Sequence, residues 1–547
     1  MNYLDWIVIS VYMAVLVGIA LYLNRHHHTI SDYYLAGRRI KWWQSGLSVM
    51  ATQLGAISFV SAPAFVALKQ GGGLKWLCYE LGIPLGLILV MAVIIPPLHK
   101  GNFISIYEYF ERRFDGSTRS MVSAFFQLGR GLATAVAVLA GGLILSTALS
   151  ISTASAILLI GIITVIYDVL GGIAVVVLSD VLQMMIIIVG VVVCCCAALY
   201  LVDWNTAWTS LSPDRLQILD FSHWGFTSEG AYAFWPMLIG GIFLYASYYG
   251  CDQSQMQRQL AVGNVDDARK SILMNALGRF PLVVMYCLVG IFVGAVVSRP
   301  EFLIKVSSLM HTDVPTAAQV LQDDPDRMLP LFILSYLPHG LIGFILVAIM
   351  SALMSSLDSA LNSLSAVTIR DFYQRYIKPV GDERHYLLAS KICTLFWGVF
   401  CIAAALVFAQ VEEATRQTTL VLINAVGSLL YGPILAAFLL GIMTKWAKSQ
   451  AVKIGVVIGI TTNVFLWLFT PVSWLWWNFF GFMIAILATA LVTTVTHSTI
   501  SFRDLFVMHV DRETTSVNWP LLYKIVLIYF FLIILFCYLS ENMFKLF

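Results

Sequence analysis

Residues 45–65 read SGLSVMATQLGAISFVSAPAF, an apolar stretch that is interrupted by hydroxyl side chains, Gln53, Gly55 and Pro63. About 20 mostly apolar residues are enough for a helix to cross a membrane, and this segment has that length. Glycine and proline weaken the helical hydrogen bonds, and backbone carbonyls that are freed at membrane depth need a partner. The stretch therefore predicts a broken membrane-spanning helix that holds a cation or a substrate. A close helix–helix contact through small residues is the alternative.

A second interrupted helix is predicted in residues 236–260, PMLIGGIFLYASYYGCDQSQMQRQL, around Gly240 and Gly241. It lies five predicted spans after the first. Interrupted helices at corresponding positions of two halves are typical of transporters built from inverted repeats. The spacing therefore predicts two five-helix halves that enclose a binding site.

The composition of the chain agrees with a protein that crosses the membrane many times. Of its 547 residues, 59% are apolar and 11% are charged, and the mean hydropathy is +0.85. Soluble proteins carry roughly 45–50% apolar and about 25% charged residues. The composition excludes a soluble enzyme, and the net charge of +2 gives no reason to expect a nucleic-acid partner. The lipid bilayer is the expected surrounding, and no feature indicates an obligatory protein partner.

Hydropathy predicts 14 membrane spans. They lie near 4–23, 44–67, 76–97, 121–148, 151–167, 176–202, 233–250, 270–298, 331–368, 387–410, 417–443, 452–470, 474–496 and 521–541. The loops that follow odd-numbered spans hold twenty of the 32 Lys and Arg residues, and the other loops and the tail hold eight. Because positive residues favour the cytoplasmic side, this bias predicts that both termini face outside.

Oxygen-bearing side chains follow one face of the ninth predicted span, residues 352–373, ALMSSLDSALNSLSAVTIRDFY. The positions i, i+3, i+4 and i+7 of this helix are Ala352, Ser355, Ser356 and Ser359, and Asp358 lies beside them. Hydroxyl and carboxylate oxygens are hard ligands that suit Na⁺. A serine-rich helix contact is the alternative, but it does not explain Asp358. In the sixth span, Asp180 is expected to pair with a basic residue or to serve an ion path.

Two arginines, Arg130 and Arg279, are predicted near the middle of the membrane. At that depth neither can reach the interface, so each needs an acidic partner or an anionic ligand. Glu80 in the third span is a candidate partner. Two interpretations of these arginines are open. Either they bind a substrate that carries a carboxylate, or each forms a closed ion pair with an acidic residue of the protein.

The chain resembles the sodium/solute symporter family, which includes the sodium–glucose, sialic acid, proline and iodide cotransporters. The resemblance rests on YDVLGGIAVVVLSDVLQ (167–183), GCDQSQMQRQLAV (250–262) and the ninth span. It implies an all-α membrane protein with a LeuT-type inverted-repeat core of ten helices over residues 42–445. The halves are expected at 42–202 and 233–443, with a leading helix in 1–30 and three more helices in 450–547.

The resemblance also implies two sodium sites. The site common to the family corresponds here to Ala51, Leu54, Ala352, Ser355 and Ser356. A second site, found in some members, corresponds to Asp180, Ser355, Asp358 and Ser359. Those members carry Ser or Thr where this chain has Asp358. The carboxylate of Asp358 either strengthens the second site or is neutralised by a proton or an arginine.

For the transported solute, the resemblance to sugar-transporting members implies a set of contact residues. These are Ser58, Glu80, Tyr245, Arg279 and Asn424, with Tyr248 as an inner gate. Arg130 corresponds to an arginine that holds the carboxylate in sialic acid transporters. The expected function is sodium-coupled import of a sugar or a sugar acid such as a sialic acid, by alternating access across the plasma (inner) membrane. The alternatives are sodium symport of another organic anion, of the monocarboxylate or vitamin type, and a proton-coupled or sodium-independent carrier of the same fold.

Overall fold

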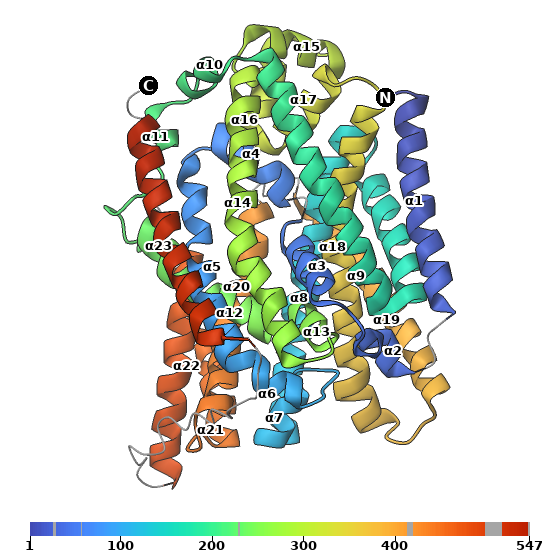
Figure 1. The fold of residues 1–547 in the computed structure, drawn as a ribbon, viewed down its shortest axis with the longest axis vertical. Coiled ribbons are helices and arrows are strands. Elements are labelled where there is room, and N and C mark those ends of the chain that lie inside the picture. The colour runs from blue at the N-terminus through green and yellow to red at the C-terminus, as the bar shows by residue number, and fades with distance from the viewer. Residues whose placement is uncertain (26–28, 56, 228–229, 413–418, 498–516, 545–547) are drawn as a thin grey trace.

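The protein is an all-helical bundle in the computed structural model (Figure 1). The structure describes the chain except residues 26–28, 56, 228–229, 413–418, 498–516 and 545–547. Within the described residues, all elements of secondary structure are helices. Ile40 and Val262 in addition form an isolated β-bridge. Elements labelled η are short 3-10 or π segments.

The elements of the first half begin with a single long helix, continue with a series of short helices, and include two consecutive long helices near their end. They are α1 (Tyr3–Asn24), α2 (Ile30–Leu35), η1 (Ala36–Arg38), α3 (Trp42–Gln53), η2 (Ile57–Ser61), α4 (Ala62–Ala67), η3 (Leu74–Glu80), α5 (Gly82–Leu89), η4 (Val90–Ile94), α6 (Ile95–Lys100), α7 (Glu108–Arg113), α8 (Gly116–Leu149), α9 (Thr153–Leu201), α10 (Trp204–Thr209) and α11 (Pro213–Leu216).

The second half repeats the mixture of short and long helices. Its elements are η5 (Pro236–Gly240), α12 (Gly241–Cys251), α13 (Gln253–Leu260), α14 (Val265–Val297), α15 (Pro300–Met310), α16 (Val314–Asp323), η6 (Pro325–Arg327), α17 (Met328–Tyr336), α18 (Leu341–Val367), η7 (Thr368–Ile377), α19 (Glu383–Glu412), α20 (Thr419–Met443), α21 (Ser449–Phe469), α22 (Trp474–His497) and α23 (Trp519–Phe544).

Many helices of this chain are long enough to cross a membrane. Within the described residues, eleven helices are long and apolar enough to cross a membrane, and a bent pair adds a twelfth. The predicted count of 14 and the outside location of the termini stay predictions. The start of α1 and the end of α23 lie at the same end of the bundle (Figure 1).

The predicted spans 151–167 and 176–202 correspond to two helices that together make up α9 and meet at a kink at Gly172. Its 49 residues would measure about 74 Å as a straight helix, far more than the roughly 30 Å of a bilayer core. Gly172 has φ 53° and ψ −159°, outside the helical region. A Cβ at this residue would also lie 2.5 Å from the carbonyl oxygen of Tyr33. Glycine is therefore required where α9 changes direction.

The interruption predicted in residues 45–65 is present. α3 ends at Gln53, Leu54 leaves the helical region with φ −91° and ψ 55°, and the segments Trp42–Gln53 and Ser58–Ala67 are bent by 63°. In the second interrupted helix, Gly240–Gly241 marks a change from π to α geometry between η5 and α12, and the break comes later, at Asp252. Each break ends a helix, and the end of a helix leaves terminal backbone groups without partners inside that helix.

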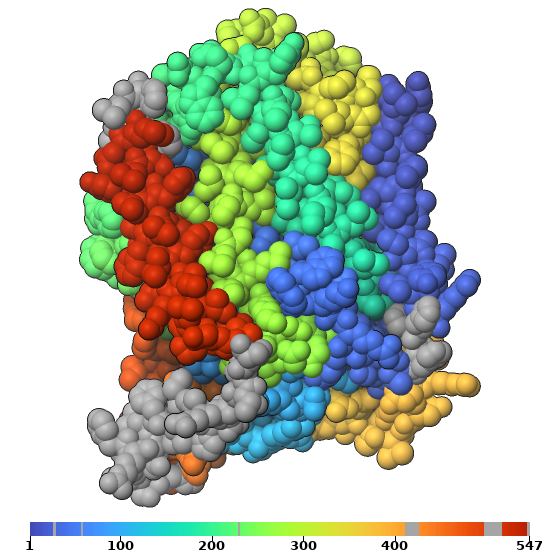
Figure 2. Space-filling view, in the orientation of Figure 1, coloured from blue at the N-terminus to red at the C-terminus, as the bar shows by residue number. Residues whose placement is uncertain are grey.

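Apolar side chains cover much of the outer surface. Large apolar residues are exposed along the helices at its edges, for example Ile7 on α1, Phe396 on α19 and Ile528 on α23. Figure 2 shows α1 and α23 at opposite edges of one face, with parts of α9 and α14 between them. An apolar exterior of this kind suits contact with lipid, and the polar clusters described below are enclosed within the bundle.

Candidate ion and solute site

The broken end of α3 contacts the serine row of α18. Ser355 Oγ donates to the carbonyl oxygen of Ala51 at 3.1 Å and to that of Ala352 at 3.2 Å. Ser356 Oγ donates to the carbonyl oxygen of Thr52 at 3.1 Å. The structure thus brings four of the five residues predicted for the common sodium site together, and Leu54 lies at the end of the same helix, α3. Carbonyl and hydroxyl oxygens on an unwound helix are groups that coordinate Na⁺ in transporters.

Gly55 allows this close approach of the two chain segments. A Cβ at Gly55 would lie 2.7 Å from Ser356 Oγ and 3.2 Å from the carbonyl oxygen of Ala352. Such distances are shorter than ordinary contacts, so a side chain would push α18 away from the break. The absence of a side chain at Gly55 therefore allows the close contact between the broken end of α3 and α18.

A second polar cluster lies around Asp180 and includes an arginine. Arg258 Nη2 lies 3.0 Å from Asp180 Oδ2, and Arg258 also donates to the hydroxyls of Ser359 and, at 2.5 Å, Ser48. Asp180 and Arg258 are both fully buried. The expectation that Asp180 pairs with a basic residue is confirmed, and the guanidinium contacts two of the four residues predicted for the second sodium site.

Asp358 lies on the other side of Ser359. Its Oδ2 accepts a hydrogen bond from Tyr167 at 2.6 Å, and its Oδ1 accepts one from Ser359 at 3.2 Å. Ser359 is in turn within 2.8 Å of Thr52 Oγ1. The second cluster is therefore connected to the first through α3, and Asp358 is held by hydroxyl groups.

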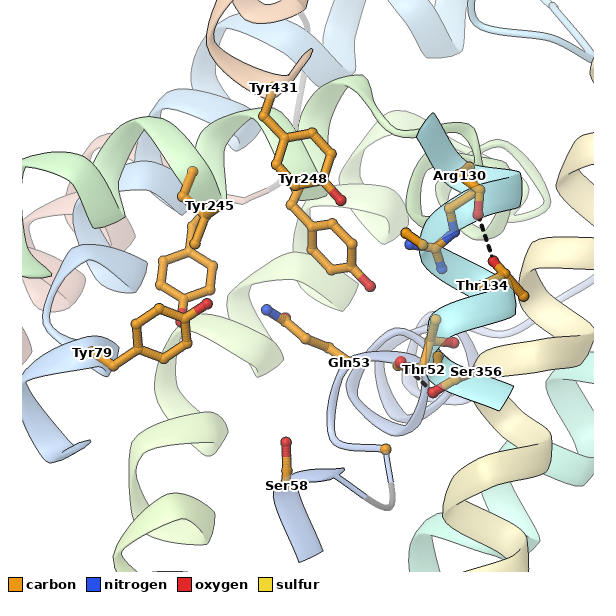
Figure 3. Close-up of a pocket in the computed structure, with 14 residues that line it drawn as sticks. Thr52, Gln53, Ser58, Tyr79, Arg130, Thr134, Tyr245, Tyr248, Ser356 and Tyr431 are labelled. Carbon is orange, nitrogen blue, oxygen red and sulfur yellow. Dashed lines mark hydrogen bonds between the residues drawn. The ribbon is translucent and has the colours of Figure 1, made fainter. Parts of the chain in front are cut away.

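A cavity of about 150 Å³ adjoins the first cluster (Figure 3). Thr52, Gly55 and Ser356 belong to both the cluster and the lining of the cavity. The remaining lining residues are Gln53, Ser58, Tyr79, Arg130, Ala133, Thr134, Ala137, Leu244, Tyr245, Tyr248 and Tyr431. Figure 3 shows Gln53 and Tyr248 pointing into the space between Tyr79 and Arg130. The cavity offers hydroxyl, amide and guanidinium groups to a polar solute.

Of the residues predicted to contact solute, Ser58, Arg130, Tyr245 and Tyr248 line this cavity. Glu80 and Arg279 do not line it. They form a buried ion pair with two contacts, 2.6 Å between Nε and Oε2 and 3.2 Å between Nη2 and Oε1. The Arg279 guanidinium lies 5.3 Å from the ring centroid of Tyr245, so the pair is next to the cavity wall. Asn424 lies on α20, where its side chain is outside the described part of the structure.

Arg130 also has an acidic neighbour. Its Nη1 lies 3.6 Å from Asp252 Oδ2, and its guanidinium lies 5.8 Å from the ring centroid of Tyr248. Both arginines that were predicted near the middle of the membrane therefore have an internal partner. For Arg130 this partner is too distant for a hydrogen bond, and its Nε is buried with no partner in the described structure.

Several of these residues were not identified from the sequence. Gln53 lies within the broken stretch and Tyr79 precedes Glu80, so both had a local signal. Asp252 and Arg258 lie in the motif at 250–262, which indicates the family resemblance but predicted no role for either residue. Tyr431 lies in an ordinary apolar span, and the sequence contains no signal for it.

Comparisons with known proteins identify the family of this chain. The family model "Sodium:solute symporter family" matches residues 33–459. The chain is 28% identical over 515 residues to a sodium/glucose cotransporter of Vibrio parahaemolyticus, which covers 90% of this chain and 89% of the relative. It is 25% identical over 520 residues to the sodium/sialic acid symporter NanT of Aliivibrio fischeri, covering 94% and 97% of the two chains.

A solved structure shares the fold. The substrate-bound outward-open state of a Na⁺-coupled sialic acid symporter superposes with a TM-score of 0.77 at 23% identity, covering 90% of this chain and 98% of the other. Because the family model spans most of the chain, the family assignment does not depend on any single motif. The chain belongs to the sodium:solute symporter family.

Proposed function

We propose that this multi-pass membrane protein is a sodium-coupled symporter that imports a sugar or a sugar acid, such as a sialic acid, by alternating access. The observation that carries the proposal is the set of residues shared between the carbonyl–hydroxyl cluster and the cavity. Ser356, Thr52 and Gly55 belong to both. An ion bound at the cluster would therefore fix one wall of the space in which the solute binds.

Sodium at the common site would be coordinated by carbonyl oxygens of α3 and α18 and by two hydroxyls. The residues proposed for it are Ala51, Leu54, Ala352, Ser355 and Ser356. By holding α3 against α18, the ion would shape the cavity, and sodium and solute would raise each other's affinity by the same factor. The membrane potential would add about 2.3 kcal/mol per charge for each 100 mV to the driving force.

The solute contacts proposed on the cavity wall are Ser58, Tyr245 and Arg130, with Tyr248 as the inner gate. The Arg130 guanidinium, whose Nε has no partner among the described residues, supports a carboxylate on the solute, and the surrounding hydroxyl and amide groups support a sugar. Glu80 and Arg279 would contact solute only if their ion pair opened, so we assign them the role of supporting Tyr245 in the state described here. Asn424 keeps its proposed role as a solute contact.

A second sodium would bind at Asp180, Ser355, Asp358 and Ser359. The Arg258 guanidinium lies between Asp180 and Ser359, so this ion requires the arginine to move away. We propose that coupling depends first on the common site and that Arg258 supplies the positive charge at the second site in the present conformation.

For the architecture, we propose 14 spans, in which α9 is counted as two helices that meet at Gly172 and η5–α12 is counted as one. The inverted-repeat core would span 42–445, with halves 42–202 and 233–443, preceded by the helix in 1–30 and followed by three helices in 450–547. Both termini would face outside the plasma (inner) membrane. The partners would be lipid, sodium and the solute.

The experiment that tests this function is a thermal-shift screen of the detergent-purified protein, followed by uptake into proteoliposomes. N-acetylneuraminate, glucose, lactate and proline would each be compared in NaCl and in choline chloride. A ligand that binds the native state raises its stability by mass action. We expect a shift that appears only in sodium, and uptake that follows the sodium gradient. Shifts and uptake that are equal in choline would overturn sodium coupling and favour a proton-coupled or sodium-independent carrier.

A further inference from the structure

The cavity of about 150 Å³ described above, called the central cavity from here on, lies next to a smaller cavity on the side of α7 and α13. This second cavity, of about 20 Å³, is lined by residues that include Tyr107, Cys251, Asp252 and Ile434. Arg130 and Tyr431 line both cavities. These two side chains therefore form part of the wall between the central cavity and the second cavity, which we call the inner wall.

The wall is held together across separate helices. Arg130 belongs to α8, whereas Asp252 lies at the junction between α12 and α13, and their side chains approach to 3.6 Å. The ring of Tyr248 on α12 lies 5.9 Å from that of Tyr431 on α20 and beneath the Arg130 guanidinium. Alternating access moves groups of helices against one another, so a contact between α8 and the α12–α13 junction must change when this wall opens.

The ion pair is arranged so that Arg130 can exchange its partner. The distance of 3.6 Å exceeds that of a hydrogen bond, and Arg130 Nε has no partner in the described residues. Asp252 Oδ1 already accepts from the backbone N–H of Ser254 at 2.8 Å and from its hydroxyl at 2.6 Å. As the residue that caps α13, Asp252 would keep these bonds if Arg130 moved away.

A solute carboxylate in the central cavity is a better partner for this guanidinium. Carboxylates bind arginine through two parallel hydrogen bonds, which are stronger than a single long ion pair. Figure 3 shows the Arg130 guanidinium pointing into the central cavity, where such a group would arrive. The solute and Asp252 therefore compete for the same side chain.

We propose that Asp252 is a gating residue of the inner wall: it holds Arg130 until the carboxylate of an anionic solute takes over the guanidinium, and this exchange releases the wall between the two cavities. The inference rests on the proposed symport function and narrows its substrate class to solutes with a carboxylate. A neutral sugar of similar size would leave the Arg130–Asp252 pair closed.

The chain contains a reporter for this exchange, because Cys251 lines the second cavity and is buried. The detergent-purified full-length protein would be treated with a polar maleimide, and the modification of each cysteine would be read by peptide mass spectrometry. Asp252→Asn keeps the cap of α13 and removes the charge. Asp115→Asn is the matched control, since Asp115 also caps a helix and also has an ion pair of 3.6 Å, with Lys453, away from both cavities.

Without solute, we expect Asp252→Asn and Arg130→Gln each to raise the labelling rate of Cys251 severalfold, with no further rise in the double variant. Asp115→Asn should match the unmodified protein. Cys287, which is buried elsewhere in the bundle, reports unfolding and should stay protected in all variants. Equal labelling of Cys251 in Asp252→Asn and Asp115→Asn would overturn the gating role.

With sodium present, N-acetylneuraminate should raise the labelling of Cys251 in the unmodified protein, and its neutral methyl ester should not. An ester that acts as strongly as the acid would overturn the exchange at Arg130. If the acid gives no sodium-dependent thermal shift, the proposed sugar-acid transport fails, while the comparison of Asp252→Asn with Asp115→Asn still decides the role of Asp252.

Discussion

Arg279 Nε lies 2.6 Å from Glu80 Oε2, and both side chains are almost completely buried next to Tyr245. The sequence predicted both residues as solute contacts, yet in this structure each has the other as its partner. Two opposite charges that satisfy one another at membrane depth do not need a ligand. The pair therefore supports the wall of the cavity, and Arg130, which lines the cavity, is the arginine that we propose as the solute contact.

Removing one member of this pair should destabilise the protein. Glu80→Gln leaves Arg279 buried without its counter-charge, and breaking a buried pair in this way costs about 3–5 kcal/mol. We expect a clear fall in Tm in detergent and a smaller fall for Glu80→Gln combined with Arg279→Gln. Arg327→Gln is the control, because Arg327 and Asp324 form a partly exposed pair worth at most about 1 kcal/mol. Unchanged Tm with lost solute binding would instead identify Glu80 as a direct contact.

Ser356→Ala tests the common sodium site. The substitution removes one hydroxyl from the cluster and leaves the helix intact, so the sodium concentration for half-maximal uptake should rise about tenfold, the equivalent of roughly 1.4 kcal/mol. Ser363→Ala on the same helix is the control, since Ser363 Oγ donates only within α18, to Ala360. The site assignment would be wrong if both variants kept the sodium dependence of the unmodified protein.

Gly55→Ala tests the close contact between the helix break and α18. The added Cβ would lie 2.7 Å from Ser356 Oγ, so α18 must shift and the protein should lose about 1–3 kcal/mol of stability together with sodium affinity. Gly18→Ala in α1 is the matched control, because a Cβ there meets nothing within 4 Å. Tm values in NaCl and choline chloride measure both effects. A Gly55→Ala protein with normal Tm and normal sodium response would show that the contact is not required.

Much of the candidate ion site could be predicted from the sequence because its signals are local. The break after Gln53 follows from glycine, proline and hydroxyl residues inside one apolar stretch, and the serine row follows from helical spacing. The role of Arg258, in contrast, could not be predicted from local sequence signals. Arg258 lies in a short polar helix, α13, which hydropathy counts as a loop, but the fold buries every residue of that helix. Only the tertiary arrangement brings its guanidinium to Asp180.

The two helices of α9 also follow from a local signal. Around Gly172 the sequence loses its apolar character over a few residues, which predicted two separate spans, and the structure has two helices that meet at a kink whose φ of 53° favours glycine. The limit applies instead to the inner wall. The Arg130–Asp252 contact joins residues more than a hundred positions apart. Charge at membrane depth indicated that Arg130 needed a partner, but it did not indicate which one.

Arg258→Gln tests whether the guanidinium and a second sodium exclude one another. Without Arg258, the buried carboxylate of Asp180 has no counter-charge, so the variant should be less stable in choline chloride than the unmodified protein. Sodium can then fill the position beside Asp180 and Ser359. We therefore expect sodium to restore more stability than it adds to the unmodified protein, and the dependence of uptake on sodium to become steeper.

The control for this prediction combines Arg258→Gln with Asp180→Asn. It removes both charges, so the extra response to sodium should disappear while the common site at Ser355 and Ser356 continues to respond. Sodium titrations of Tm for the three proteins separate these cases. If the titration of Arg258→Gln matched that of the unmodified protein, Arg258 would be a structural partner of Asp180 and the second site would not bind sodium in this chain.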